Sequence, residues 1–270
     1  MEYFIDDVRY YVETCGEGYP LLLLHGFTGD SSTWLPFCSK WGRHSRLIIP
    51  DLIGHGKTES LQDLKRYAIE SAANDLRLLL DEIGVDQVDL LGYSMGGRLG
   101  LTFSLLFPER VRKLILESSS PGLLTEEDRS QRRKQDQKLA LTILEKGIGD
   151  FVDYWENIPL FSTVKEAPGD VKEAIRQQRL SQNPDGLANS LLGMGTGSQP
   201  SWWDKLHLIE NETLLVTGEK DKKFCRIAEK MSAELKKSRW AMIKNSGHAI
   251  HVEEPEKFGT IVSGFLTQLM

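Results

Sequence analysis

The sequence predicts an α/β fold, a mostly parallel, doubly wound sheet with a helical lid inserted between two of its strands. Short apolar runs alternate with stretches of helical periodicity, as expected when strands and crossover helices follow one another. Several of these runs are continuously apolar, which is typical of parallel strands covered on both faces. One long interval lacks strand signals altogether, and this interval predicts the insertion.

Buried strands are expected at six apolar runs, which cover residues 21–24, 47–49, 88–91, 113–117, 213–216 and 240–243. An amphipathic helix is expected over residues 69–83, ending at Gly84 as its C-cap, and another over residues 255–269. From residue 121 to 205 the pattern is helical and is interrupted by four prolines. We therefore expect a core of residues 1–120 and 206–270, with residues 121–205 forming the lid.

The composition limits the possible partners. The chain has 270 residues, of which 40% are hydrophobic and 27% charged, with a formal net charge of −6. This acidic balance argues against nucleic acid or an anionic membrane as the main partner. The sequence contains no apolar run of about 18 residues and no signal-peptide pattern. We expect a cytoplasmic protein, a monomer or weak homo-oligomer, that acts on a small molecule.

The chain has three widely spaced cysteines, Cys15, Cys38 and Cys225. Their odd number and the lack of a Cys-x-x-Cys pair predict three reduced thiols. The six histidines show no metal-ligand spacing, so no metal site is expected.

The most informative motif is Gly92-Tyr93-Ser94-Met95-Gly96, which lies between the apolar run 88–91 and a helical run 98–107. A serine on a tight turn from strand to helix is exposed at the edge of the sheet, and glycines let the backbone pass closely. This context predicts a nucleophile elbow with Ser94 as its reactive residue.

A serine of this kind needs a histidine to accept its proton and a carboxylate to orient that histidine. In α/β-hydrolase sheets these residues follow in the order serine, acid, histidine. The acid predicted here is Asp221, with Glu219 as the alternative, because both follow the strand at 213–216. The histidine predicted is His248, since Gly247 lets its ring approach the elbow; His251 is expected to be a capping or surface residue.

A loop rich in small residues, His25-Gly26-Phe27-Thr28-Gly29, follows the first buried strand. We expect the N–H groups of Phe27 and Met95 to form an oxyanion hole, while His25 has a structural role. By themselves, the elbow, triad and loop predict a carboxylester or carbon–carbon bond hydrolase.

Several arginines near the predicted site indicate a negatively charged ligand, which simple ester hydrolysis does not require. Arg98 lies one helical turn after Ser94, where an unpaired guanidinium is costly, so either a bound anion or a structural ion pair is expected. In the lid, Arg129, Arg132 and Arg133 have spacings that turn at least one of them inward. Lid tryptophans are expected to pack the lid on the core, with Trp155 lining the pocket.

Four motifs together resemble one known family. They are Gly-Tyr-Ser-Met-Gly-Gly-Arg at the elbow, Glu-Ser-Ser-Ser-Pro-Gly-Leu from residue 117, Arg-x-x-Arg in the lid, and Thr-Gly-Ser-Gln-Pro-Ser-Trp-Trp from residue 196. With these motifs the chain resembles the 2-succinyl-6-hydroxy-2,4-cyclohexadiene-1-carboxylate (SHCHC) synthases of menaquinone biosynthesis, which have the α/β-hydrolase fold. The resemblance extends over essentially the whole chain.

The resemblance implies a carbon–oxygen lyase that removes pyruvate from 2-succinyl-5-enolpyruvyl-6-hydroxy-3-cyclohexene-1-carboxylate, a tricarboxylate, without a metal, nucleotide or flavin cofactor. It also implies site residues. Ser94, Asp221 and His248 match the family's triad, with Ser94 as the base that removes a proton. The positions that match the family's substrate contacts are Tyr93, Arg98, Arg132, Trp155 and Arg179.

Overall fold

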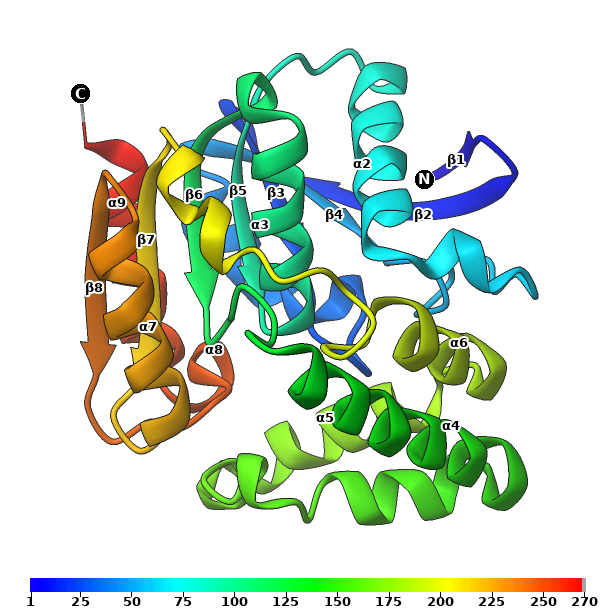
Figure 1. Ribbon diagram of the computed structural model, residues 1–270. Helices are drawn as coiled ribbons and strands as arrows, with labels where there is room; N and C mark the ends of the chain where they lie inside the picture. Colours follow the sequence, from blue (N-terminus) through cyan, green and yellow to red (C-terminus); the bar gives the residue numbers. More distant parts are fainter. Residues whose placement is uncertain (269–270) are drawn as a thin grey trace.

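The computed structural model describes residues 1–268, and its centre is a twisted sheet (Figure 1). Within these residues the sheet has eight strands in the order β1-β2-β4-β3-β5-β6-β7-β8. Only the pairs that involve β2 are antiparallel; every other neighbouring pair is parallel, as predicted. The strands are β1 (Glu2–Ile5), β2 (Val8–Cys15), β3 (Tyr19–Leu24), β4 (Ser45–Pro50), β5 (Val88–Tyr93), β6 (Val111–Glu117), β7 (Glu212–Gly218) and β8 (Ser238–Ile243).

The six predicted runs lie in β3 to β8, whereas β1 and β2 were not predicted. Strand β2 alternates buried Val8, Tyr10 and Val12 with more exposed residues. Such a period of two is typical of a strand with one buried face, so the signal was present in the sequence. Strand β1 has four residues and offers too short a pattern to recognise.

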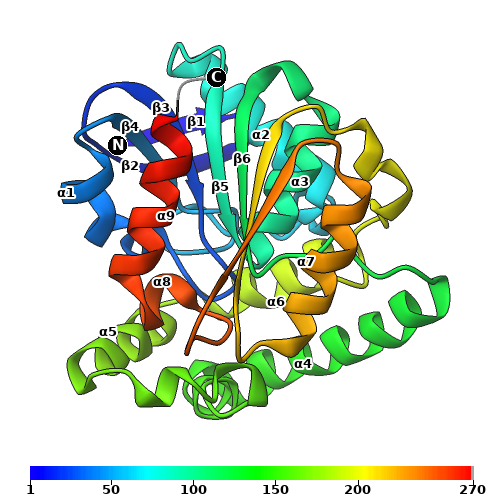
Figure 2. The same cartoon turned by 90° about the vertical axis from the view of Figure 1, so that its left-hand side faces the viewer.

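Helices cover both faces of the sheet (Figure 2). On one face α2, α3 and α7 contribute Leu76, Leu99 and Ala228 to one apolar cluster, and on the other α1 and α9 contribute Trp41 and Phe258 to a second. This is the doubly wound arrangement that the alternation of strands and helices predicts. The helices of the core are α1 (Cys38–Trp41), α2 (Ile69–Glu82), α3 (Met95–Leu106), α7 (Lys222–Glu234), α8 (Ile250–Glu253) and α9 (Pro255–Thr267).

Between β6 and β7 the described chain forms helices and no strand. The long helices there are α4 (Glu126–Trp155), α5 (Gly169–Leu180) and α6 (Pro184–Met194). Helix α4 bends at Gly147, whose φ of 84° departs from helical geometry. These helices lie across the end of the sheet toward which β6 points (Figure 1), so they cover the edge where a strand-to-helix elbow presents its side chain.

The cysteines and the C-terminal helix differ from what the sequence predicted. Cys15, at the end of β2, and Cys38, at the start of α1, form a disulfide, and only Cys225 has a free thiol. The prediction of three reduced thiols is therefore wrong, because the sheet brings together two cysteines 23 positions apart. The helix expected over residues 255–269 ends at Thr267, and Leu269 lies outside the described residues.

No helix within residues 1–268 is long and apolar enough to cross a membrane.

Candidate active site

Ser94 occupies the turn between β5 and α3 in a strained conformation. Its φ is 50° and its ψ −103°, a combination that a non-glycine residue rarely adopts. A Cβ on Gly92 would lie 2.3 Å from the carbonyl oxygen of Gly96, and a Cβ on Gly96 would lie 2.3 Å from that of Leu24. A larger residue at 92 would thus push the start of α3 away from β5, and one at 96 would push it away from β3, which explains why glycines flank the serine.

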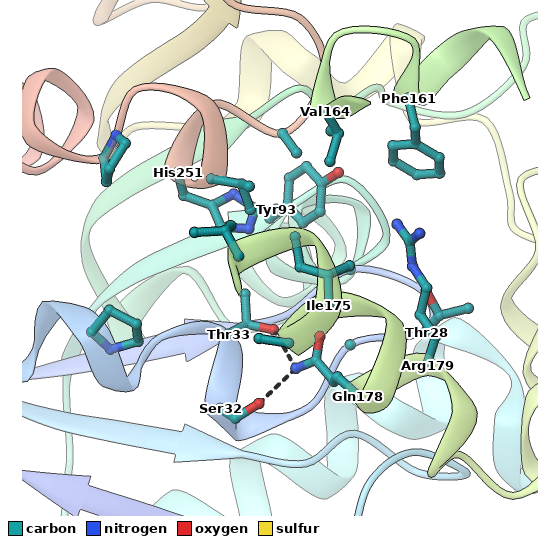
Figure 3. A pocket seen from close by; sticks show the side chains of 18 of the residues that line it. Thr28, Ser32, Thr33, Tyr93, Phe161, Val164, Ile175, Gln178, Arg179 and His251 are labelled. Carbon is teal, nitrogen blue, oxygen red and sulfur yellow. Dashed lines mark hydrogen bonds between the residues drawn. The ribbon is translucent and has the colours of Figure 1, made fainter. Parts of the chain in front are cut away.

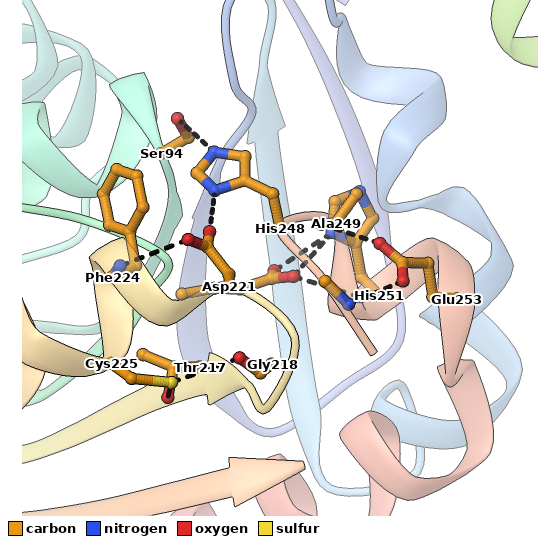
Figure 4. A network of polar contacts seen from close by, with 12 residues as sticks. Ser94, Thr217, Gly218, Asp221, Phe224, Cys225, His248, Ala249, His251 and Glu253 are labelled. Carbon is orange, nitrogen blue, oxygen red and sulfur yellow. Dashed lines mark hydrogen bonds and ion pairs between the residues drawn. The ribbon is translucent and has the colours of Figure 1, made fainter. Parts of the chain in front are cut away.

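Ser94, His248 and Asp221 form a continuous hydrogen-bonded chain (Figure 4). His248 Nδ1 lies 2.7 Å from Asp221 Oδ2, and His248 Nε2 lies 3.1 Å from Ser94 Oγ. With the Nδ1 proton donated to the carboxylate, Nε2 is left to accept the hydroxyl proton of Ser94. The ring is buried at 1% exposure, so its orientation is fixed by packing as well as by hydrogen bonds.

Asp221 is held in place by the helix that follows it. Its second oxygen, Oδ1, accepts the backbone N–H of Phe224 at 3.2 Å and so caps the N-terminus of α7. The alternative acid, Glu219, instead accepts the backbone N–H of Asn245. The structure therefore pairs Asp221 rather than Glu219 with the histidine.

His251 is not the capping or surface residue that we expected. Its ring is buried, and Nδ1 lies 2.9 and 3.0 Å from the two carboxylate oxygens of Glu117 at the end of β6. The ring also packs against that of Tyr93, with centroids 4.6 Å apart. The expectation failed because α8 turns back onto the sheet, a tertiary feature that the local sequence does not specify.

The loop after β3 lies beside Ser94, as the predicted oxyanion hole would need. Phe27 and Met95 both line the cavity that contains Ser94. Met95 is the first residue of α3, where backbone N–H groups have no acceptor within the helix. Thr28 has a φ of 69°, so the loop carries local strain beside the site. His25 is buried and accepts the N–H of Leu52 at 2.9 Å, in keeping with a structural role.

The cavity around Ser94 has a volume of about 160 Å³. Its wall combines apolar and positively charged groups, including Tyr93, Arg98, Arg132, Trp155 and Phe161. The indole N–H of Trp155 is buried and has no hydrogen-bond partner among the described residues. A buried donor without an acceptor is uncommon in proteins and is consistent with a site that a ligand completes.

Arg98 lies on the floor of this cavity with 9% of its surface exposed. Its Nη1 donates to the carbonyl oxygen of Met194, at 2.7 Å, and to the amide oxygen of Gln199. Both acceptors are neutral, so the structural ion pair considered from the sequence is not formed. Burial, together with nearby Arg132, lowers the pKa of Arg98 to about 9. The site thus holds a buried cation whose charge is not neutralised by a direct partner.

Arg132 is the lid arginine that reaches the cavity. Its Nε donates to Asp136 Oδ1 at 2.8 Å, which leaves the terminal amino groups of the guanidinium for another acceptor. Asp136 is buried, and burial raises the pKa of its carboxyl. Arg129 and Arg133 both bind Glu126 on the outside of α4. Of the three arginines near the start of α4, only Arg132 therefore reaches the cavity.

Arg179, by contrast, does not line the cavity that contains Ser94. It lines a neighbouring cavity of about 340 Å³ together with Tyr93, Phe161 and His251 (Figure 3). Its guanidinium lies over the ring of Phe161, 5.0 Å from the centroid, and burial lowers its pKa. Tyr93 and Phe161 line both cavities, so they separate Arg179 from the serine.

Comparison with known proteins agrees with this geometry. A model of the alpha/beta hydrolase fold family matches residues 19–255. This chain belongs to the α/β hydrolase fold family. The fold class predicted from the sequence is thereby confirmed.

Similar proteins within this family narrow the comparison to particular enzymes. A provisionally named SHCHC synthase of Bacillus subtilis is 46% identical over 98% of this chain and 97% of its own length. The structure of MenH from S. aureus is 37% identical, with a TM-score of 0.91 over 95% of this chain and 97% of that one. A malate-bound thermophilic esterase from Thermogutta terrifontis is 28% identical, with a TM-score of 0.85 over 96% and 93% of the two chains. The resemblance to the SHCHC synthases inferred from the motifs is confirmed.

Among the residues of the Ser94 cavity that the sequence did not predict, one carries a charge. Lys223, in the first turn of α7, lines the cavity with Ser94, Arg98 and Arg132. A signal for it existed, because Lys223 follows the predicted acid Asp221 by two positions. Its lysine neighbours at 220 and 222 give this stretch the pattern of a solvated charged surface, which hides that signal.

Proposed function

We propose that this chain forms SHCHC by eliminating pyruvate from 2-succinyl-5-enolpyruvyl-6-hydroxy-3-cyclohexene-1-carboxylate. One observation carries the proposal beyond the shared fold. The serine of an ordered Ser–His–Asp chain opens into the same small cavity as Arg98, a buried guanidinium whose hydrogen bonds go to neutral acceptors. A site built in this way favours a polyanionic substrate over a neutral ester.

The names of substrate and product define the electron flow. A base removes the proton from ring carbon C2, next to the succinyl ketone, and the C–H electrons form the C2=C3 double bond. The former C3=C4 pair moves to C4=C5, and the C5–O bond to the enolpyruvyl group breaks. The enolate that leaves takes up a proton and becomes pyruvate, so atoms and electrons balance.

The triad supplies the base. A serine hydroxyl is a weak base at its ordinary pKa, so Ser94 needs His248 to take its proton as the substrate proton is transferred. Asp221 holds the ring in the required tautomer and stabilises the charge that forms on it. We propose that the N–H groups of Phe27 and Met95 stabilise the negative charge that develops on the succinyl ketone oxygen. Each of these steps uses only groups of the chain and of the substrate.

The substrate contacts follow from the cavities. Arg98 and Arg132 are proposed to bind two of the carboxylates, and Trp155 to donate its unpaired N–H. A cavity of about 160 Å³ is smaller than the roughly 300 Å³ or more of an ordinary small-molecule site. The substrate must therefore extend past Tyr93 toward Arg179, or the helical segment 121–205 must shift as a lid. We propose that this segment acts as the lid and that the enzyme is cytoplasmic.

The direct test is an assay of the purified protein with the proposed substrate, following pyruvate with a coupled dehydrogenase and the diene product by mass spectrometry. We expect stoichiometric release of both products and a loss of activity in Ser94→Ala. Absence of pyruvate release, or full activity of Ser94→Ala, would rule out the proposal.

A carboxylester hydrolase is the alternative that the same triad allows, and a 28% identical relative is named an esterase. The two functions differ in a covalent intermediate. A hydrolase of this kind forms an acyl-enzyme at Ser94, whereas the elimination leaves the serine unmodified. Intact-mass measurement after rapid quenching with substrate distinguishes them, because only the hydrolase gains the mass of an acyl group.

A further inference from the structure

We infer that Lys223 is a further substrate-binding residue, which binds a carboxylate at the α7 side of the cavity. The inference rests on the proposed function, since it concerns the tricarboxylate of that reaction. Lys223 lines the cavity together with Ser94, Arg98 and Arg132, and α7 begins directly after Asp221. The resemblance to the SHCHC synthases implied no role for this position.

Lys223 does not serve the stability of its own helix. Helix α7 begins with Lys222 and Lys223 and has no acidic residue in its first turn. The N-terminus of a helix carries a partial positive charge, so acidic residues are stabilising there and lysines are not. Asp221 supplies the cap through Oδ1, and the helix needs nothing further from the lysine.

The nearby carboxylates also do not explain why a lysine stands at position 223. Asp221 is engaged by His248 and by the N–H of Phe224, and the neighbouring Lys220 binds Glu166. Partial burial of Lys223 and, after it, the charge of Arg132 lower the pKa of the lysine, while the charge of Asp221 acts in the opposite direction. Positive groups from α3, α4 and α7 thus line one small space. Asp136 pairs with Arg132 there, and a bound anion would offset the positive charge that remains.

The number of cations matches the proposed substrate. Arg98 and Arg132 provide for two carboxylates in the cavity that contains Ser94, and Arg179 lies beyond Tyr93 in the neighbouring one. Lys223 gives the Ser94 cavity a third cation of its own. A lysine suits this exposed rim position, because its flexible stem lets the ammonium follow a carboxylate as the ligand enters.

The experiment compares Lys223→Met with Lys222→Met, a matched neighbour that carries the same charge in the same helical turn and does not line the cavity. We expect Lys223→Met to raise KM roughly 10- to 100-fold, as for loss of a hydrogen bond to a charged group, with kcat changed only a few-fold. Lys223→Arg should recover most of the loss, and Lys222→Met should behave as wild type. The pH profile of kcat should be the same in all four proteins.

Two results would overturn the inference. An unchanged KM in Lys223→Met would show that the lysine does not contact the substrate. A shifted pH profile of kcat with an unchanged KM would show that it acts instead on the Asp221–His248 pair.

A second measurement separates this inference from the proposed function. Calorimetry with propane-1,2,3-tricarboxylate, an unreactive tricarboxylate, measures binding in all four proteins. If the wild type releases no pyruvate but binds this probe more tightly than Lys223→Met does, the proposed reaction fails and the role of Lys223 stands. If Lys223→Met and wild type bind it equally, the role of Lys223 is refuted whatever the reaction.

Discussion

Replacing Arg98 with methionine tests the anion site most directly. Methionine keeps an unbranched apolar stem and removes the guanidinium from the cavity. If the guanidinium binds a substrate carboxylate, its loss should weaken transition-state binding by about 2–5 kcal/mol, as for truncation of a buried charge pair. That range corresponds to a fall in kcat/KM of roughly 30- to 5000-fold.

Two opposing contributions should act on the free energy of unfolding. The substitution leaves the carbonyl of Met194 and the amide oxygen of Gln199 without their donor, which costs about 1–3 kcal/mol for each buried group. It also removes a buried charge that has no direct carboxylate partner, and this gain opposes the cost. Urea unfolding should therefore show a folded variant with a modestly changed midpoint.

The pH dependence provides an independent check. Because the pKa of Arg98 is lowered to about 9, the free enzyme loses this cation as the pH rises through that value. The kcat/KM of the wild type should fall above about pH 9, and this fall should be smaller in Arg98→Met, where only Lys223 still loses its charge at alkaline pH. A folded Arg98→Met variant with nearly wild-type kcat/KM would refute the reasoning and leave the arginine a structural role.

Three further predictions concern the triad, the lid and the cysteines. Asp221→Asn should lower kcat by up to roughly 10⁴-fold through loss of the correct histidine tautomer, while calorimetry still detects substrate binding; a normal kcat would remove Asp221 from the mechanism. Arg132→Met should raise KM strongly, whereas Arg129→Met, which loses only its bond to Glu126, should not; equal effects in steady-state kinetics would contradict the inward orientation of Arg132. Alkylation of the denatured protein without reductant should modify only Cys225, and with reductant all three cysteines; three adducts without reductant would show that the disulfide is absent.

Much of the fold followed from the sequence because its signals are local. An apolar run long enough for a buried strand can be recognised from its own residues, and six of the eight strands in residues 1–268 were found in this way. The elbow is equally recognisable from its own residues, because glycines on both sides of Ser94 and the apolar run before it form one short motif. The order of serine, acid and histidine then identified three residues whose side chains do form one hydrogen-bonded chain.

What the sequence could not decide is which side chains share a cavity. Ser94 and His248 are 154 positions apart and meet only because β5 and the loop after β8 end at the same edge of the sheet. The motif match grouped Arg179 with Arg98, yet the packing of α5 places Arg179 beyond Tyr93. Lys223 lines the cavity although the sequence did not predict it. His251 and the Cys15–Cys38 pair were misjudged for the same reason. Backbone conformation depends on residues a few positions away, whereas the neighbours of a side chain depend on how whole helices pack against the sheet.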